Sequence, residues 1–171
     1  MKTKNGKNIN RIFHGDAAPE NIPWQVRLRI PETDGLTYSC GGTILDKTTI
    51  LTATHCVSNA LKDSPNFQIF AGVVDRFDPT AQTIGIDKVF IHPDWNSGNS
   101  DIAILKLKIP LTFIEGVVQH ACLPETSFEP INGETVVASG WGDTENGFDQ
   151  DLQVLSPLSQ KLSTNSSVIV P

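Results

Sequence analysis

The sequence predicts an all-β fold in which short strands close into a barrel or pack as a sandwich. Residues 25–30 alternate strictly between polar and apolar side chains, which is the period of a half-buried strand. Segments rich in proline, glycine and aspartate, such as 31–35 and 92–98, separate the apolar runs at intervals typical of turns. No convincing amphipathic helix interrupts this pattern. Closure into a barrel would also remove exposed strand edges.

The first part of the chain carries the clearest strand patterns. The expected strands are 25–30, 43–45, 50–53, 67–73, 83–91 and 102–108. The only helical signal is 54–61, about two turns long. A second unit begins near residue 123, with strands expected at 134–142 and 152–160. Two strands alone cannot bury a core in water, so this second unit is expected to be incomplete.

Composition places the chain among ordinary globular proteins. Hydrophobic residues make up 39% and charged residues 19% of its 171 residues, which excludes a disordered chain. The net charge of −6 argues against nucleic acid or an anionic membrane as a partner. No apolar run approaches the length of a membrane span. The basic start of the chain has no apolar h-region, so no secretory signal is visible.

The three cysteines are an odd number. Cys40 and Cys56 can pair, which leaves Cys122 without a partner in this chain. A free thiol, an intermolecular bond and a partner outside this sequence are the alternatives for Cys122, and the last is the favoured interpretation.

Three motifs follow one another in a fixed order. The first runs from Cys40-Gly-Gly-Thr through Leu-Thr-Ala-Thr to His55-Cys56, and the second is Ser-Asp101 followed by the apolar run Ile-Ala-Ile-Leu. The third is Ser139-Gly-Trp-Gly. Together they resemble the chymotrypsin/trypsin-like serine peptidases, and the resemblance covers roughly residues 11–160. It implies a chymotrypsin-like antiparallel β-barrel fold, with the first barrel complete and the second truncated.

The resemblance also implies a division of the chain. Residues 1–11 correspond to an N-terminal extension, 12–122 to the first barrel, and 123–171 to the start of a second barrel with a degenerate tail. Arg11 and Ile12 match the zymogen cleavage site, where cutting frees an apolar N-terminus. The alternative is that Arg11 is an ordinary exposed basic residue and that no cleavage takes place there. Cys40 and Cys56 match a family disulfide, and Cys122 stands where a link to another segment is often made.

His55 and Asp101 match the base and the acid of the family's catalytic triad. Imidazole titrates near neutrality, so His55 could accept a hydroxyl proton and return it to a leaving amine, while Asp101 orients the ring. A core histidine, or a metal site formed with Cys56, are the alternatives for His55, although adjacent residues make poor co-ligands. Asp101 could instead cap a strand at the surface. The mechanism implies neither metal nor organic cofactor.

No Gly-Asp-Ser-Gly-Gly-Pro segment, which would carry the nucleophile, occurs in the sequence. The resemblance implies a secreted serine endopeptidase that acts on proteins or peptides. Because the nucleophile segment is missing, this chain is expected to be an inactive fragment as it stands. The alternative is a non-catalytic serine-protease homologue that acts as a secreted binding module. His14, His92 and His120 fit no catalytic pattern and are expected at the surface or in loops.

Overall fold

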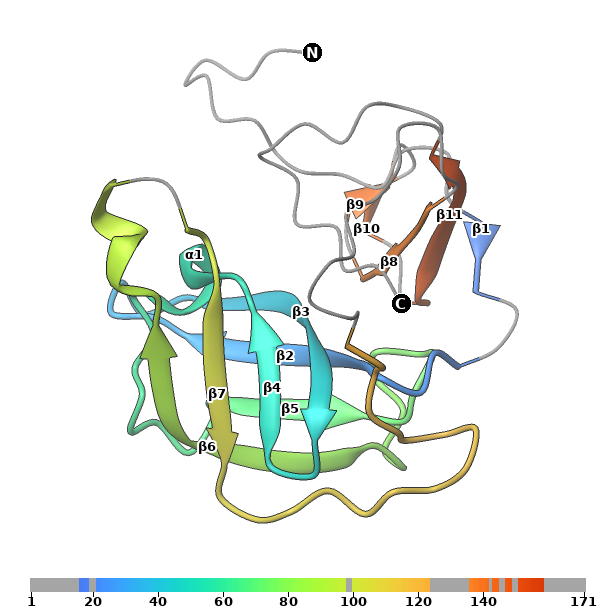
Figure 1. Ribbon diagram of the computed structural model, residues 1–171, viewed down its shortest axis with the longest axis horizontal. Helices are drawn as coiled ribbons and strands as arrows, with labels where there is room; N and C mark the ends of the chain where they lie inside the picture. The colour runs from blue at the N-terminus through green and yellow to red at the C-terminus, as the bar shows by residue number, and fades with distance from the viewer. Residues whose placement is uncertain are drawn as a thin grey trace.

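The computed structural model describes residues 16–18, 21–97, 100–123, 136–141, 143–144, 147–148 and 151–158. Figure 1 shows a barrel formed by the first part of the chain and a smaller group of strands beside it. The elements, in chain order, are β1 (Asp16–Ala17), β2 (Gln25–Pro31), β3 (Thr37–Asp46), β4 (Thr49–Thr52), α1 (Thr54–Val57), β5 (Gln68–Ala71), β6 (Gln82–Ile91), η1 (Pro93–Ser97), β7 (Ala103–Leu107), β8 (Val136–Gly140), β9 (Asp143–Thr144), β10 (Gly147–Phe148) and β11 (Gln153–Leu158).

Six strands form a closed antiparallel barrel in the order β2-β3-β4-β7-β6-β5 (Figure 1). The all-β prediction and the six expected strands are confirmed, with β5 (Gln68–Ala71) shorter than the predicted 67–73 and two further differences in length. β3 is longer than the predicted 43–45 because residues 37–41 also pair through their backbone with β2. Their sequence has no apolar alternation that would predict a strand. The helix is shorter than the predicted 54–61 and ends at Val57.

The barrel interior holds the main core. Alternate residues of β2, namely Val26, Leu28 and Ile30, are fully buried there. Strand pairing brings them together with Ile50 of β4 and Leu105 of β7, which are equally buried. Burial of each such side chain contributes about 1.5–3 kcal/mol relative to its exposure. The period of two along the strands therefore sets which residues fill the barrel.

Two glycines are required by this packing. A Cβ on Gly42 would lie 2.8 Å from Cγ2 of Ile50 and 2.9 Å from Cδ1 of Leu28, so β3 approaches its neighbours more closely than a side chain allows. Gly72 follows β5 with a φ of 81°, in the left-handed region that other residues rarely adopt. These positions let the strands close around the core.

The second group of strands is smaller. β8 and β11 pair within a three-stranded sheet of order β1-β11-β8, and β9 and β10 form a separate hairpin. The predicted strands 134–142 and 152–160 correspond to β8 and β11. β1 was not predicted, since two residues carry no periodicity, and it crosses over to pair with β11. Trp141 and Leu152 are buried here against Ala18 and Val73.

Several predicted features lie outside the described residues. They are the extension 1–11, the cleavage pair Arg11 and Ile12, His14, and the tail beyond 160. Within the part of the chain that is described, no helix combines the length and the apolar character needed to cross a bilayer.

Candidate active site

The site lies at one end of the barrel, where β4 ends and β7 begins. Thr52 of β4 pairs with Ala103 of β7, so the residues just after one strand and just before the other share that end. His55 is carried by α1, and Asp101 lies two residues ahead of β7. Strand pairing thus brings together two side chains that are 46 residues apart in sequence.

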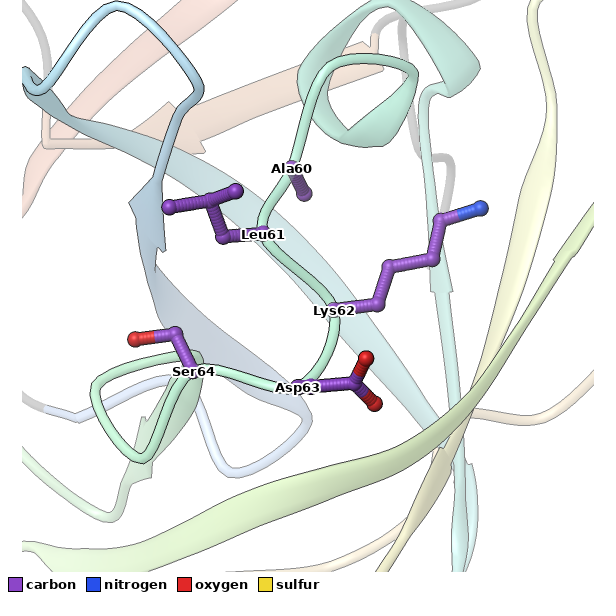
Figure 2. Close-up of a pocket in the computed structure, with 5 residues that line it drawn as sticks. All are labelled: Ala60, Leu61, Lys62, Asp63 and Ser64. Carbon is purple, nitrogen blue, oxygen red and sulfur yellow. The ribbon is translucent and has the colours of Figure 1, made fainter.

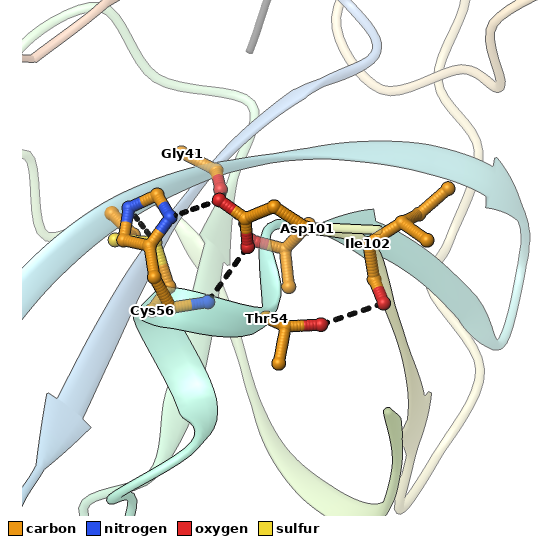
Figure 3. Close-up of polar contacts among 8 residues, drawn as sticks. Gly41, Thr54, Cys56, Asp101 and Ile102 are labelled. Carbon is orange, nitrogen blue, oxygen red and sulfur yellow. Dashed lines mark hydrogen bonds and ion pairs between the residues drawn. A yellow bond between two sulfur atoms is a disulfide. The ribbon is translucent and has the colours of Figure 1, made fainter. Parts of the chain in front are cut away.

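Asp101 receives two hydrogen bonds from His55 (Figure 3). Nδ1 of the ring lies 2.5 Å from Oδ2, and the backbone N–H of His55 donates to Oδ1 at 2.8 Å. The carboxylate therefore fixes both the ring and the backbone that carries it. The predicted contact between these two side chains is present.

The electrostatics of Asp101 favour its ionised form. Partial burial raises the pKa of this carboxyl, but the hydrogen bonds from the ring and the backbone of His55, its charge and the backbone N–H of Thr54 lower it by more. The net pKa of Asp101 is therefore below its ordinary value. An ionised carboxylate accepts hydrogen bonds and does not donate one, so Nδ1 carries the proton.

The second ring nitrogen of His55 is then the basic one. Nε2 lies 3.5 Å from Sγ of Cys56, and half of the side chain's surface is exposed. A neutral imidazole with its proton on Nδ1 has a lone pair on Nε2. Such a lone pair can accept a proton from a donor placed within hydrogen-bond distance.

Thr54 anchors the helix that carries His55. Its side chain is fully buried, and Oγ1 donates to the carbonyl of Ile102 at 2.7 Å (Figure 3). This bond ties α1 to the residue next to Asp101. The sequence pattern did not identify this role of Thr54, because a local pattern does not show which carbonyl its hydroxyl meets.

Cys40 and Cys56 form a disulfide, as predicted, with Cα atoms 6.3 Å apart. Their sulfur atoms and His55 form a cluster of potential metal ligands within 4.8 Å of one another. Zinc binds cysteine as thiolate, and the disulfide removes both thiolates. A metal site at His55 would therefore lack its cysteine ligands. The disulfide instead stabilises the turn that carries His55.

The side chains of the other predicted residues take no part in the contact between His55 and Asp101. His92 is half-buried and accepts a hydrogen bond from the backbone N–H of Asp94 on Nδ1, and His120 is exposed in a loop. Cys122 is a free, exposed thiol among the described residues. Ser139 lies on β8 and donates to Oε1 of Gln25 at 3.1 Å, which links the two groups of strands.

A shallow depression lies along the segment that follows α1 (Figure 2). Consecutive residues line it: Ala60, Leu61, Lys62, Asp63 and Ser64. Leu61 and Lys62 point away from each other in Figure 2. Its two charged residues, Lys62 and Asp63, form no ion pair with each other, and the lining includes neither His55 nor Asp101.

Comparison with known proteins agrees with this geometry. The family model described as Trypsin matches residues 12–168. An ovochymase from Halocynthia roretzi is 33% identical over 172 residues, which covers 94% of this chain and 10% of that protein.

Solved structures share the fold. The structure of GrC has a TM-score of 0.73 at 24% identity, covering 85% of this chain and 64% of that one. The scabies mite inactivated protease paralogue S-I1 has a TM-score of 0.71 at 28% identity, covering 83% of this chain and 63% of that one. The chain thus spans less than two thirds of these proteins. With its barrel, its disulfide and a family match over most of its length, this chain belongs to the trypsin family.

Proposed function

We propose that His55 and Asp101 are the general base and the orienting acid of a serine-type endopeptidase. The observation that carries this proposal is the double hydrogen bond from His55 to one carboxylate, which fixes the ring and leaves Nε2 as the basic atom. The Trypsin family match supports the reaction class and implies protein substrates. The Ser-His-Asp arrangement of this family is the template for the mechanism below.

In this mechanism Nε2 of His55 removes the proton of a serine hydroxyl while its oxygen attacks the carbonyl carbon of the peptide. The imidazolium that forms is paired with the Asp101 carboxylate, and it passes the same proton to the leaving amine. Water then hydrolyses the acyl-enzyme through the same base. The lowered pKa of Asp101 keeps this carboxylate ionised while the ring gains and loses its proton.

The catalytic serine of this mechanism has to be supplied by a further segment of chain. The 171 residues contain no Gly-Asp-Ser-Gly-Gly-Pro segment, and a base without a nucleophile cannot perform acyl transfer. We therefore expect no hydrolysis of peptide or ester substrates by these residues alone. Cleavage after Arg11 would free Ile12 as an activating N-terminus, and the disulfide agrees with an extracellular location.

The test uses a form of the protein in which the nucleophile segment follows these residues in frame. His55→Ala should abolish turnover, and Asp101→Asn should lower kcat about 10⁴-fold, the loss known for the family's template triad. Asp87→Asn, an exposed carboxylate on β6, is the matched control and should leave kcat unchanged. Retention of turnover in His55→Ala would refute the proposed base.

A second candidate is a non-catalytic binding protein. Two structural neighbours are inactivated protease paralogues of the scabies mite, S-D1 with a TM-score of 0.72 and S-I1 with 0.71. The intact contact between His55 and Asp101 favours the peptidase. The form with the nucleophile segment separates the two candidates, because a binding protein would show no turnover in it even after cleavage at Arg11.

A further inference from the structure

A cationic pocket lies on the outer face of the barrel, against β2, β3 and β5. Its lining includes three basic and three aromatic residues: Arg27, Arg29, Arg76, Tyr38, Phe70 and Phe77. Arg11 is the one arginine of the sequence that lies elsewhere along the chain. Neither His55 nor Asp101 lines this pocket, so it is distinct from the candidate active site.

The strand period places two of these arginines side by side. Leu28 of β2 is fully buried in the barrel, so Arg27 and Arg29 on either side of it face outward. Arg27 pairs across the sheet with Gly41 on β3 and with Phe70 on β5. The Phe70 ring forms one flank of Arg27, and on the side of Gly41 the Gln25 side chain lies close enough that its Nε2 would be 3.1 Å from an added Cβ.

Arg27 is unusual because it is charged and buried, and no carboxylate of the described residues forms an ion pair with it. Its exposed fraction is 9%, and its guanidinium carbon lies 4.2 Å from the centre of the Phe70 ring. Nη2 donates to the carbonyl of Arg76 at 3.2 Å, whereas Nε is buried without a hydrogen-bond partner. A buried charge with unmet hydrogen-bonding capacity is costly unless an opposite charge joins it.

The surroundings make that cost larger. Burial lowers the pKa of Arg27, and the positive charges of Arg76 and Arg29 lower it further. Among the described residues, no carboxylate forms an ion pair with Arg27 or Arg29. Three of the four arginines of a chain whose net charge is −6 therefore gather at this one place.

The rim of the pocket is apolar as well as charged. Phe77 is 66% exposed and Tyr38 is 43% exposed. The Tyr38 hydroxyl donates to Asp34, which holds the ring at the rim. A ligand that carries carboxylates and an apolar side chain would use both features, whereas a sulfated polysaccharide would use the charge alone.

We propose that this pocket binds an acidic peptide segment in which an aromatic or aliphatic side chain lies next to the carboxylates. Guanidinium groups pair with carboxylates in two-pronged geometry, and the exposed rings bury the apolar side chain. This binding site is separate from peptide-bond hydrolysis. It requires neither a nucleophile nor the roles proposed for His55 and Asp101.

The test measures fluorescence anisotropy of a labelled peptide of aspartate and glutamate residues that includes two phenylalanines, added to the full 171-residue chain. Because charged hydrogen bonds carry the affinity, Arg29→Gln should weaken binding about fivefold and Arg27→Gln about tenfold. Phe77→Ser should weaken it about threefold through the loss of apolar contact. Lys88→Gln, which removes an exposed positive charge on β6, is the matched control and should leave binding unchanged.

Three comparison ligands complete the design. A peptide with asparagine and glutamine in place of the acids should not bind, and one with serine in place of phenylalanine should bind more weakly. Binding of a sulfated oligosaccharide but not of the acidic peptide would assign the pocket to polysaccharide and overturn the proposal. Equal affinity of the chain and Arg29→Gln for the acidic peptide would also overturn it. Arg29 is only partly buried on β2, so this variant keeps the test valid if Arg27→Gln fails to fold.

Discussion

The barrel and the second group of strands differ in how they bury their apolar residues. In the barrel every strand has two neighbours, and Leu28, Ile50 and Leu105 are fully enclosed. The second group packs Trp141 and Leu152 against Val73, which belongs to the segment after β5 of the barrel. The described part of the second group therefore depends on the barrel for its core. Ring closure gives the barrel a core of its own.

The largest expected effect comes from the barrel core. Leu105→Ala should lower the free energy of unfolding by about 2–5 kcal/mol, because the surrounding strands cannot collapse into the cavity. Urea unfolding followed by circular dichroism measures this change. Ile109→Ala, whose side chain is 60% exposed, is the control and should stay within about 0.5 kcal/mol of the parent. An equally small loss in Leu105→Ala would mean that the barrel is not the main core.

The disulfide should come next. The double change Cys40→Ser and Cys56→Ser should lower the free energy of unfolding by about 3 kcal/mol, since the bond closes a loop with a sequence separation of 16. Cys122→Ser, at a free and exposed position, should have little effect on the same measurement. A comparable loss from Cys122→Ser would contradict the assignment of the stabilising bond.

A smaller and more local effect is expected at the contact between the two regions. Nε1 of Trp141 donates to the carbonyl of Val74 at 2.7 Å, and Trp141→Phe removes this donor at a cost of about 1 kcal/mol. Hydrogen exchange should accelerate in β8 and β11 but not in β4 and β7. Acceleration throughout the barrel would show that the two regions unfold as a single unit.

The smallest effect concerns pH at the turn between β3 and β4. Hydrogen bonds from the Thr49 hydroxyl and from the backbone and hydroxyl of Thr48 lower the pKa of Asp46 below its ordinary value, against a smaller effect of burial. The folded state thus binds the Asp46 proton more weakly than the unfolded state does. Its stabilisation is present above the ordinary carboxyl pKa of about 4 and is lost as the pH falls through the lowered value.

Asp46→Asn measures this contribution. Its free energy of unfolding should be lower than that of the parent at pH 7, and the difference should shrink as the pH falls below about 4. Asp87→Asn, at an exposed position on β6, should show no such pH-dependent difference. A difference for Asp46→Asn that grows toward acid pH would reverse the sign of the argument.

Local patterns in the sequence were sufficient to predict most strands of the barrel. The alternation of residues 25–30 predicted β2, although the strand is not half-buried as expected, because Gln25 and Arg27 of the polar face are buried too. β1 was not predicted because it is stabilised by backbone pairing with the distant β11. Residues 37–41 of β3 were not predicted because they pair with the preceding strand, β2, without an apolar periodicity. The helix that carries His55 is shorter than predicted, because the sequence does not show where the backbone hydrogen bonds of the helix end.

By itself the sequence determined the order of the motifs, the strand period that fills the barrel, and the cysteines available for pairing. Only the tertiary structure decided that His55 meets Asp101, because the pairing of Thr52 with Ala103 brings the ends of β4 and β7 together. It also decided that Arg76 joins Arg27 and Arg29 in one pocket. Such contacts depend on strand register across long separations, and a local pattern carries no record of register between distant strands.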